Sequence, residues 1–158
     1  TGTFAMGLYV LLYVLANLGA FLVIHAVSED SDDFDLSKYN GLSRRSPVLA
    51  FAMLLFMLSL AGIPPLAGFV GKFFLFAAGM EAGLWALVLF GAVASTVSLY
   101  YYLMVAKRMY IVPPSDDPES VQVSPPLSFA IGVCAVITVV AGLYPAPWVN
   151  LAQNIVSR

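Results

Sequence analysis

The chain has 158 residues, of which 61% are hydrophobic and 10% are charged, and its formal net charge at pH 7 is −2. Soluble domains carry about 25% charged residues, so this composition excludes an ordinary soluble domain and predicts a membrane protein with several crossings. The net charge indicates nothing about partners, but the sequence has no basic stripe of the kind that binds nucleic acid.

Four segments are apolar enough to cross a bilayer, which takes about 20 residues of helix. They are 4–27, 47–78, 84–106 and 127–144, joined by 28–46, 79–83 and 107–126. We therefore predict an all-α polytopic membrane protein with four transmembrane helices. The chain opens without an initiator Met or a charged n-region, so we expect it to be the C-terminal part of a longer protein.

The first helix carries a polar stripe in an otherwise apolar segment. Tyr9, Tyr13 and Asn17 follow one another at four-residue spacing and so share one helical face. Asn17 needs a partner inside a bilayer, so this face is expected to look into protein, where it could equally serve as interhelical contact. His25, near the end of this helix, could pass protons toward the following loop, but an interfacial histidine without a task is the commoner case.

The acidic run "SEDSDDFD" (28–35) follows this helix. An EF-hand loop needs ligands at alternate positions and a Gly at the sixth. Counting from Asp30, the fifth position is Phe34 and the sixth is Asp35, so we predict a solvated loop and no metal site.

The second hydrophobic segment, 47–78, is longer than one straight crossing needs, although length alone does not decide whether it is broken. As a continuous helix it would measure about 48 Å, whereas the hydrocarbon core is about 30 Å thick. Pro64 and Pro65 cannot donate backbone hydrogen bonds and clash with the preceding turn, and Gly62 and Gly68 loosen the flanks. We predict two half-helices broken near 62–66, with a simple proline kink healed by neighbouring helices as the alternative.

Lys72 lies two turns after Pro65. Helical side chains lean toward the N-terminus of their helix, so its ammonium should reach back toward the break, where backbone dipoles of both half-helices act on it. We predict that Lys72 transfers protons, with the break supplying water and dipoles. In the alternative, Lys72 snorkels to the outer interface, with Glu81 as a possible ion-pair partner.

The third helix carries a weaker signal. Ser95, Ser98 and Tyr102 share one face and could line a proton path, although packing of small residues against a neighbouring helix is the commoner role of such a face. No Asp or Glu lies inside the four spans, so a full pathway must use residues outside this chain. The single cysteine, Cys134, forms no disulfide within the chain and is expected to be a small buried hydrophobe.

Basic residues predict the orientation in the membrane. With four crossings, 28–46 and 107–126 lie on the same side, and by the positive-inside rule that side is cytoplasmic. Both ends of the chain are then outside. That assignment compares five basic residues, Lys38, Arg44, Arg45, Lys107 and Arg108, with Arg158 alone on the other side.

The stretch "LSLAGIPPLAGFVGKFF" around Lys72 resembles the broken twelfth helix of the antiporter-like membrane subunits of respiratory complex I. The tyrosine triplet of the third helix points to the subunit N (subunit 2) branch. Multi-subunit sodium/proton antiporters and membrane-bound hydrogenases share the core motif. The other segments that carry the resemblance are "LANLGAF" (15–21), "YNGLSRRSPVLA" (39–50), "SLYYYLMVAKRMY" (98–110) and "GLYPAPW" (142–148).

This resemblance implies a proton-translocating subunit of a NADH:quinone oxidoreductase in a bacterial inner membrane, with both ends of this chain periplasmic and Lys72 at the distal end of a proton half-channel. It implies no redox cofactor in this chain, with FMN, iron–sulfur clusters and quinone in partner subunits. The implied partners are other membrane subunits of complex I, the lipid bilayer and protons. An antiporter or hydrogenase subunit and a purely structural scaffold segment remain the alternatives.

Overall fold

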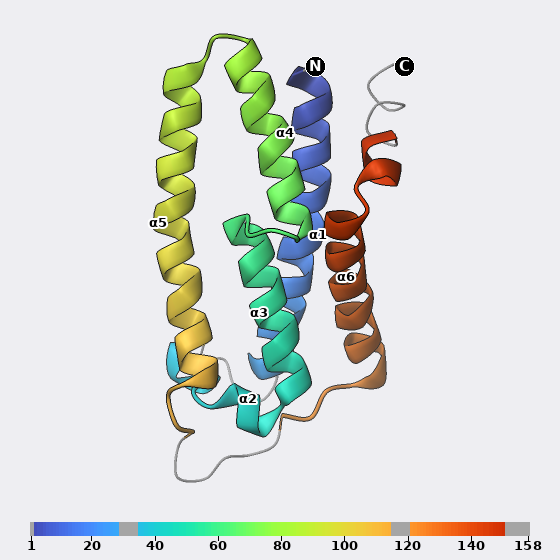
Figure 1. The fold of residues 1–158 in the computed structure, drawn as a ribbon. Helices are drawn as coiled ribbons and strands as arrows, with labels where there is room; N and C mark the ends of the chain where they lie inside the picture. The colour runs from blue at the N-terminus through green and yellow to red at the C-terminus, as the bar shows by residue number, and fades with distance from the viewer. Residues whose placement is uncertain (1, 29–34, 115–120, 151–158) are drawn as a thin grey trace.

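The computed structural model describes residues 2–28, 35–114 and 121–150, and within these ranges its regular elements are helices, without strands. The predicted all-α membrane fold is confirmed. Three helices are long and apolar enough to cross a membrane, and a fourth crossing is divided between two shorter helices, α3 and α4 (Figure 1). The three long helices are α1 (Gly2–Ser28), α5 (Trp85–Tyr110) and α6 (Pro125–Leu143).

The fourth crossing consists of α3 (Pro47–Ala61) and α4 (Ala67–Glu81), separated by residues 62–66. Helix α3 ends where Gly62 takes a left-handed φ of 85° and donates its N–H to the carbonyls of Leu58 and Ser59. Two half-helices form here, and not the healed proline kink. Each has 15 residues and measures about 22 Å, and the break lies roughly halfway along α1 (Figure 1).

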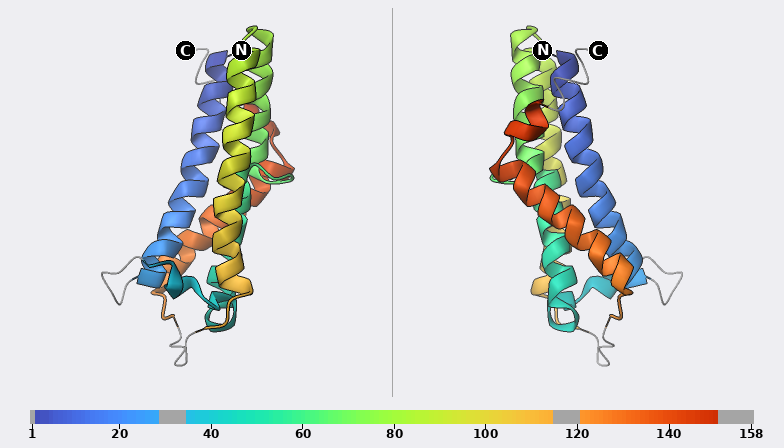
Figure 2. Two further views of the ribbon diagram at one scale, coloured as in Figure 1. Left: turned by 90° about the vertical axis from the view of Figure 1, so that its left-hand side faces the viewer. Right: turned by 90° about the vertical axis from the view of Figure 1, so that its right-hand side faces the viewer.

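Buried apolar side chains gather in two clusters, one on each side of the break. The first joins α1, α3, α5 and α6 through side chains such as Val23, Phe56 and Ile131. The second joins α1, α4 and α6 and includes Leu12 and Val70. Helix α6 crosses the other helices obliquely (Figure 2) and so contributes to both clusters. The break therefore lies between two packed regions that hold its flanking helices.

The connection between α1 and α3 contains η1 (Leu36–Tyr39) and α2 (Leu42–Arg45). Hydrogen bonds from the Ser37 hydroxyl and N–H hold the pKa of the Asp35 carboxyl below its usual value. The N–H of Gly41 donates to the Arg108 carbonyl at 3.0 Å, so the end of α5 is fastened to this connection. The basic residues of α2 and of the last turn of α5 thus lie at one end of the bundle (Figure 1). Most of the acidic run (29–34) and Arg158 lie outside the described residues.

Candidate functional site

The ammonium of Lys72 lies at the helix break. Its Nζ donates hydrogen bonds to the carbonyl oxygens of Leu60 at 2.9 Å and Ala61 at 3.1 Å, and to the Ser95 Oγ at 3.2 Å. In an unbroken helix those two carbonyls would accept from the N–H groups of residues 64 and 65. Both positions are proline, which has no N–H. Lys72 therefore supplies the donors that the double proline removes.

This geometry excludes the snorkelling alternative in this structure. Lys72 is half-buried, and its side chain runs from α4 back toward the end of α3. Glu81 is exposed at the opposite end of α4. The carbonyls of α3 and the hydroxyl of α5 are thus the polar groups that hold the lysine, and the carboxylate of Glu81 is not among them.

Glycines allow the backbone to approach closely around the lysine. A Cβ on Gly62 would come within 2.9 Å of Lys72 Cδ, in addition to the strain of its positive φ. A Cβ on Gly68 would fall on the Ser59 carbonyl oxygen. Pro64 and Pro65 are exposed, and Gly142 at the end of α6 lies directly against the Pro65 carbonyl. The break is therefore packed against α6, while its two proline rings face outward.

A cavity of about 300 Å³ extends from Lys72 between α1, α4 and α5. Water takes about 30 Å³ per molecule in the liquid, so the space has room for several. The structure brings the predicted face of α5 to this cavity and adds two tyrosines from α1 to it. The polar side chains that line it are Lys72, Ser95, Ser98, Tyr102, Tyr9 and Tyr13.

Tyr9 and Tyr13 are site residues that sequence reasoning did not assign to the lysine. Their rings stack with centroids 5.5 Å apart. Their four-residue spacing predicted a face turned toward protein, but not which helix it would meet. Asn17, the third member of that stripe, donates to the Tyr13 carbonyl of its own helix at 2.9 Å, so its partner lies within α1.

Other predicted residues lie away from the cavity. His25 is exposed in the last turn of α1 and is not among the residues that line the cavity. Cys134 is buried in α6, within the first apolar cluster. Within residues 2–28, 35–114 and 121–150, no three His, Cys, Asp or Glu side chains gather as metal ligands.

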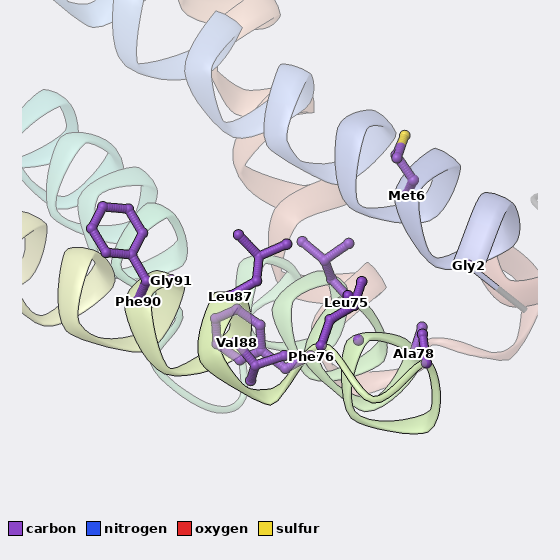
Figure 3. Close-up of a pocket in the computed structure, with 12 residues that line it drawn as sticks. Gly2, Met6, Leu75, Phe76, Ala78, Leu87, Val88, Phe90 and Gly91 are labelled. Carbon is purple, nitrogen blue, oxygen red and sulfur yellow. The ribbon is translucent and has the colours of Figure 1, made fainter.

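Beyond Phe76, the lining next to the lysine cavity is apolar. A second cavity of about 380 Å³ is lined by apolar side chains and glycines of α1, α4, α5 and the connection between α4 and α5. Figure 3 shows Leu75 and Phe76 of α4 beside Val88 of α5, with Met6 of α1 across the pocket. Leu75 and Phe76 line both cavities. From Lys72, the cavity therefore offers hydroxyl groups in the direction of Ser98 and Tyr102, whereas in the direction of Phe76 its surroundings are apolar.

Comparison with known proteins gives consistent results. The profile of the family described as NADH:quinone oxidoreductase/Mrp antiporter, transmembrane, matches residues 1–98. NADH-quinone oxidoreductase subunit N of Moorella thermoacetica is 43% identical, over 97% of this chain and 32% of that protein.

Two solved structures resemble the fold. A chain of respiratory complex I from Thermus thermophilus with bound aureothin superposes with a TM-score of 0.82 at 36% identity, covering 94% of this chain and 34% of that chain. A chain of the Mrp complex from Dietzia sp. gives a TM-score of 0.78 at 20% identity, covering 95% of this chain and 36% of that chain, a likeness of fold alone. This chain spans about a third of the length of the curated relatives that it matches.

Proposed function

The chain belongs to the NADH:quinone oxidoreductase/Mrp antiporter transmembrane family, and from this premise we propose that it is part of a proton-translocating membrane subunit of a NADH:quinone oxidoreductase. Relatives named NADH-quinone oxidoreductase subunit N match nearly its whole length at 43% and 48% identity. The structural likeness to respiratory complex I supports the same assignment.

The position of Lys72 is the observation that carries the proposal. Burying a charged lysine at the centre of a bilayer costs about 2.5–3.5 kcal/mol on insertion scales, and here two carbonyls and a hydroxyl offset part of that cost. A change in a nearby charge can therefore make the amine release or take up a proton. Lys72 acts as the proton-transfer residue of this chain.

The cavity supplies a route for the proton. Water beside Lys72 exchanges protons with its amine, and the hydroxyls of Ser95, Ser98 and Tyr102 extend the polar lining along α5. Hydroxyl groups both donate and accept hydrogen bonds, so they can orient water and pass protons. His25 has no contact with this route in the structure and stays a prediction.

The redox chemistry belongs to other subunits in this proposal. FMN, the iron–sulfur clusters and quinone are held by partner subunits, and quinone reduction there drives proton movement here. The partners of this chain are the other membrane subunits and the lipid of a bacterial inner membrane. The loop side with α2 is cytoplasmic and both ends of the chain are periplasmic, in agreement with the distribution of basic residues.

A subunit of a multi-subunit sodium/proton antiporter or membrane-bound hydrogenase is the second candidate, because the Mrp neighbour shares this fold. Purification of the full-length protein with its partners separates the candidates. We expect flavin and iron–sulfur clusters in the purified complex, and NADH-driven, quinone-dependent proton translocation after reconstitution into vesicles. A complex without these cofactors that exchanges sodium for protons would contradict the proposal.

A further inference from the structure

Ser59 places a second polar side chain at the break. It lies in the last turn of α3 with 0% of its surface exposed. Its Oγ accepts a hydrogen bond from the backbone N–H of Gly68, in the first turn of α4, at 3.0 Å. A buried hydroxyl of one half-helix is thus bonded directly to the backbone of the other.

This hydrogen bond supplies what the start of α4 lacks. The first N–H groups of a helix have no partner within the helix, and an N-cap side chain with an oxygen commonly accepts from one of them. The N-cap position of α4 is Leu66, which makes no side-chain cap. Ser59 therefore caps α4 from the neighbouring half-helix, and the bond fixes how the two half-helices meet.

The same contact governs the surroundings of the lysine. The two carbonyls that hold Lys72 belong to Leu60 and Ala61, which directly follow Ser59 in the chain. Lys72 itself lies one turn after Gly68, the partner of Ser59. A shift of α4 relative to α3 would therefore change the distances from the lysine Nζ to both carbonyls.

We propose that Ser59 is a positioning residue for proton transfer: its hydroxyl holds the two half-helices in the register that keeps the Lys72 ammonium on the carbonyls of Leu60 and Ala61. This inference rests on the proposed function, because it assigns Ser59 a role in the exchange carried by Lys72. Ser59 and Gly68 are not among the residues that line the cavity of about 300 Å³, so replacing Ser59 leaves the lining of that cavity unchanged.

The test replaces Ser59 in the full-length protein and measures proton translocation per electron in the assembled complex as a function of pH. In Ser59→Ala the pH profile should shift by about half a pH unit or more, with translocation per electron about threefold lower, as expected for one lost hydrogen bond. Ser59→Thr keeps the hydroxyl and should restore the parent profile even if less complex assembles. Should Ser59→Ala fail to assemble, Ser59→Cys provides the comparison, because sulfur is a weak acceptor.

Thr138→Val is the matched control. Thr138 is also buried, but its hydroxyl donates to the Cys134 carbonyl within α6 at 2.8 Å, so its loss should leave the profile unchanged. The role of Ser59 would be overturned if Ser59→Ala, or Ser59→Cys where that variant is used, kept the pH profile of the parent. It would also be overturned if Thr138→Val shifted the profile as much. Lys72→Met, measured in parallel, separates the two claims: if it translocates protons normally, the proposed function fails, whereas if only Ser59→Ala behaves normally, this inference fails.

Discussion

At the scale of single residues, the ammonium of Lys72 replaces two missing backbone hydrogen-bond donors. Proline at 64 and 65 leaves the carbonyls of Leu60 and Ala61 without their helical partners, and the ammonium bonds to both. Loss of the proton would leave the amine two N–H donors for three acceptors, so its bond to the Ser95 hydroxyl would be lost or would reverse direction. The charge on the lysine and the local structure of the break are therefore linked.

The Ser95 hydroxyl is the one side-chain oxygen that accepts from the lysine in the part of the chain that the structure describes. We expect Ser95→Ala to lower proton translocation per electron by roughly two- to tenfold, the value of one hydrogen bond, measured with the assembled complex in vesicles. Thr96→Ala is the control, because that hydroxyl is exposed and donates to the Ala92 carbonyl of its own helix. An equal effect of the two substitutions would argue against the bond to Ser95.

A substitution at Gly62 tests whether the Lys72 side chain must pass close to the backbone of the break. An alanine there would take a positive φ, at a cost of about 1–3 kcal/mol, and its Cβ would lie 2.9 Å from Lys72 Cδ. We expect Gly62→Ala to displace the lysine and to lower translocation per assembled complex, whereas Gly7→Ala, which has open space, should leave it unchanged. Normal translocation by Gly62→Ala would show that the lysine does not need this contact.

At the scale of the elements, the break is a packed structure and not a loose loop. Ser59 joins α3 to α4, and Gly68 and Gly142 allow backbones to meet without side chains between them. Small residues permit such approaches in membrane proteins, where close packing and hydrogen bonds drive helix association. The two half-helices are therefore held at a defined separation, as a site built from both of them requires.

Gly68→Ala tests this packing. Its Cβ would meet the backbone of Ser59, which cannot rotate away, so we expect a destabilisation of about 1–3 kcal/mol, seen as a lower thermal midpoint and less assembled complex. Gly132→Ala, where nothing lies within reach of a Cβ, is the control. If this chain is only a structural scaffold, the small amount of Gly68→Ala complex that still assembles should translocate protons as well as the parent complex.

The sequence predicted the parts of this site that depend on local chemistry. Two prolines in the interior of a helix interrupt it, and a helical lysine leans toward the N-terminus of its helix, so the break and the direction of Lys72 were predictable. The bond from Ser59 and the arrival of Tyr9 and Tyr13 at the cavity were not. They depend on how segments distant in the chain pack, which the spacing of residues within one helix does not specify.

At the scale of the whole molecule, charge and hydroxyl groups are distributed unevenly along the bundle. The basic residues of α2 and of the last turn of α5 lie at one end of the bundle, while the connection between α4 and α5 lies at the other end (Figure 1). Serine and tyrosine hydroxyls line the lysine cavity, whereas the pocket that shares Leu75 and Phe76 with it is apolar. The two halves of the molecule on either side of Lys72 thus differ in character.

Labelling with a membrane-impermeant maleimide tests the proposed orientation. In a Cys134→Ala background, we expect Leu36→Cys in η1 to react in inverted membrane vesicles, because the positive-inside rule puts that end in the cytoplasm. Ala82→Cys, exposed at the end of α4, should react only from the periplasmic side. The reverse pattern would contradict the orientation.

The number of protons translocated per electron by the Lys72→Met complex tests the central claim most directly. Methionine has a similar length but cannot bind a proton, so the ratio should fall while the complex still assembles with its redox cofactors. Lys107→Met removes an exposed lysine from the last turn of α5 and should keep the parent ratio. A Lys72→Met complex that assembles fully and translocates as many protons per electron as the parent would contradict the account.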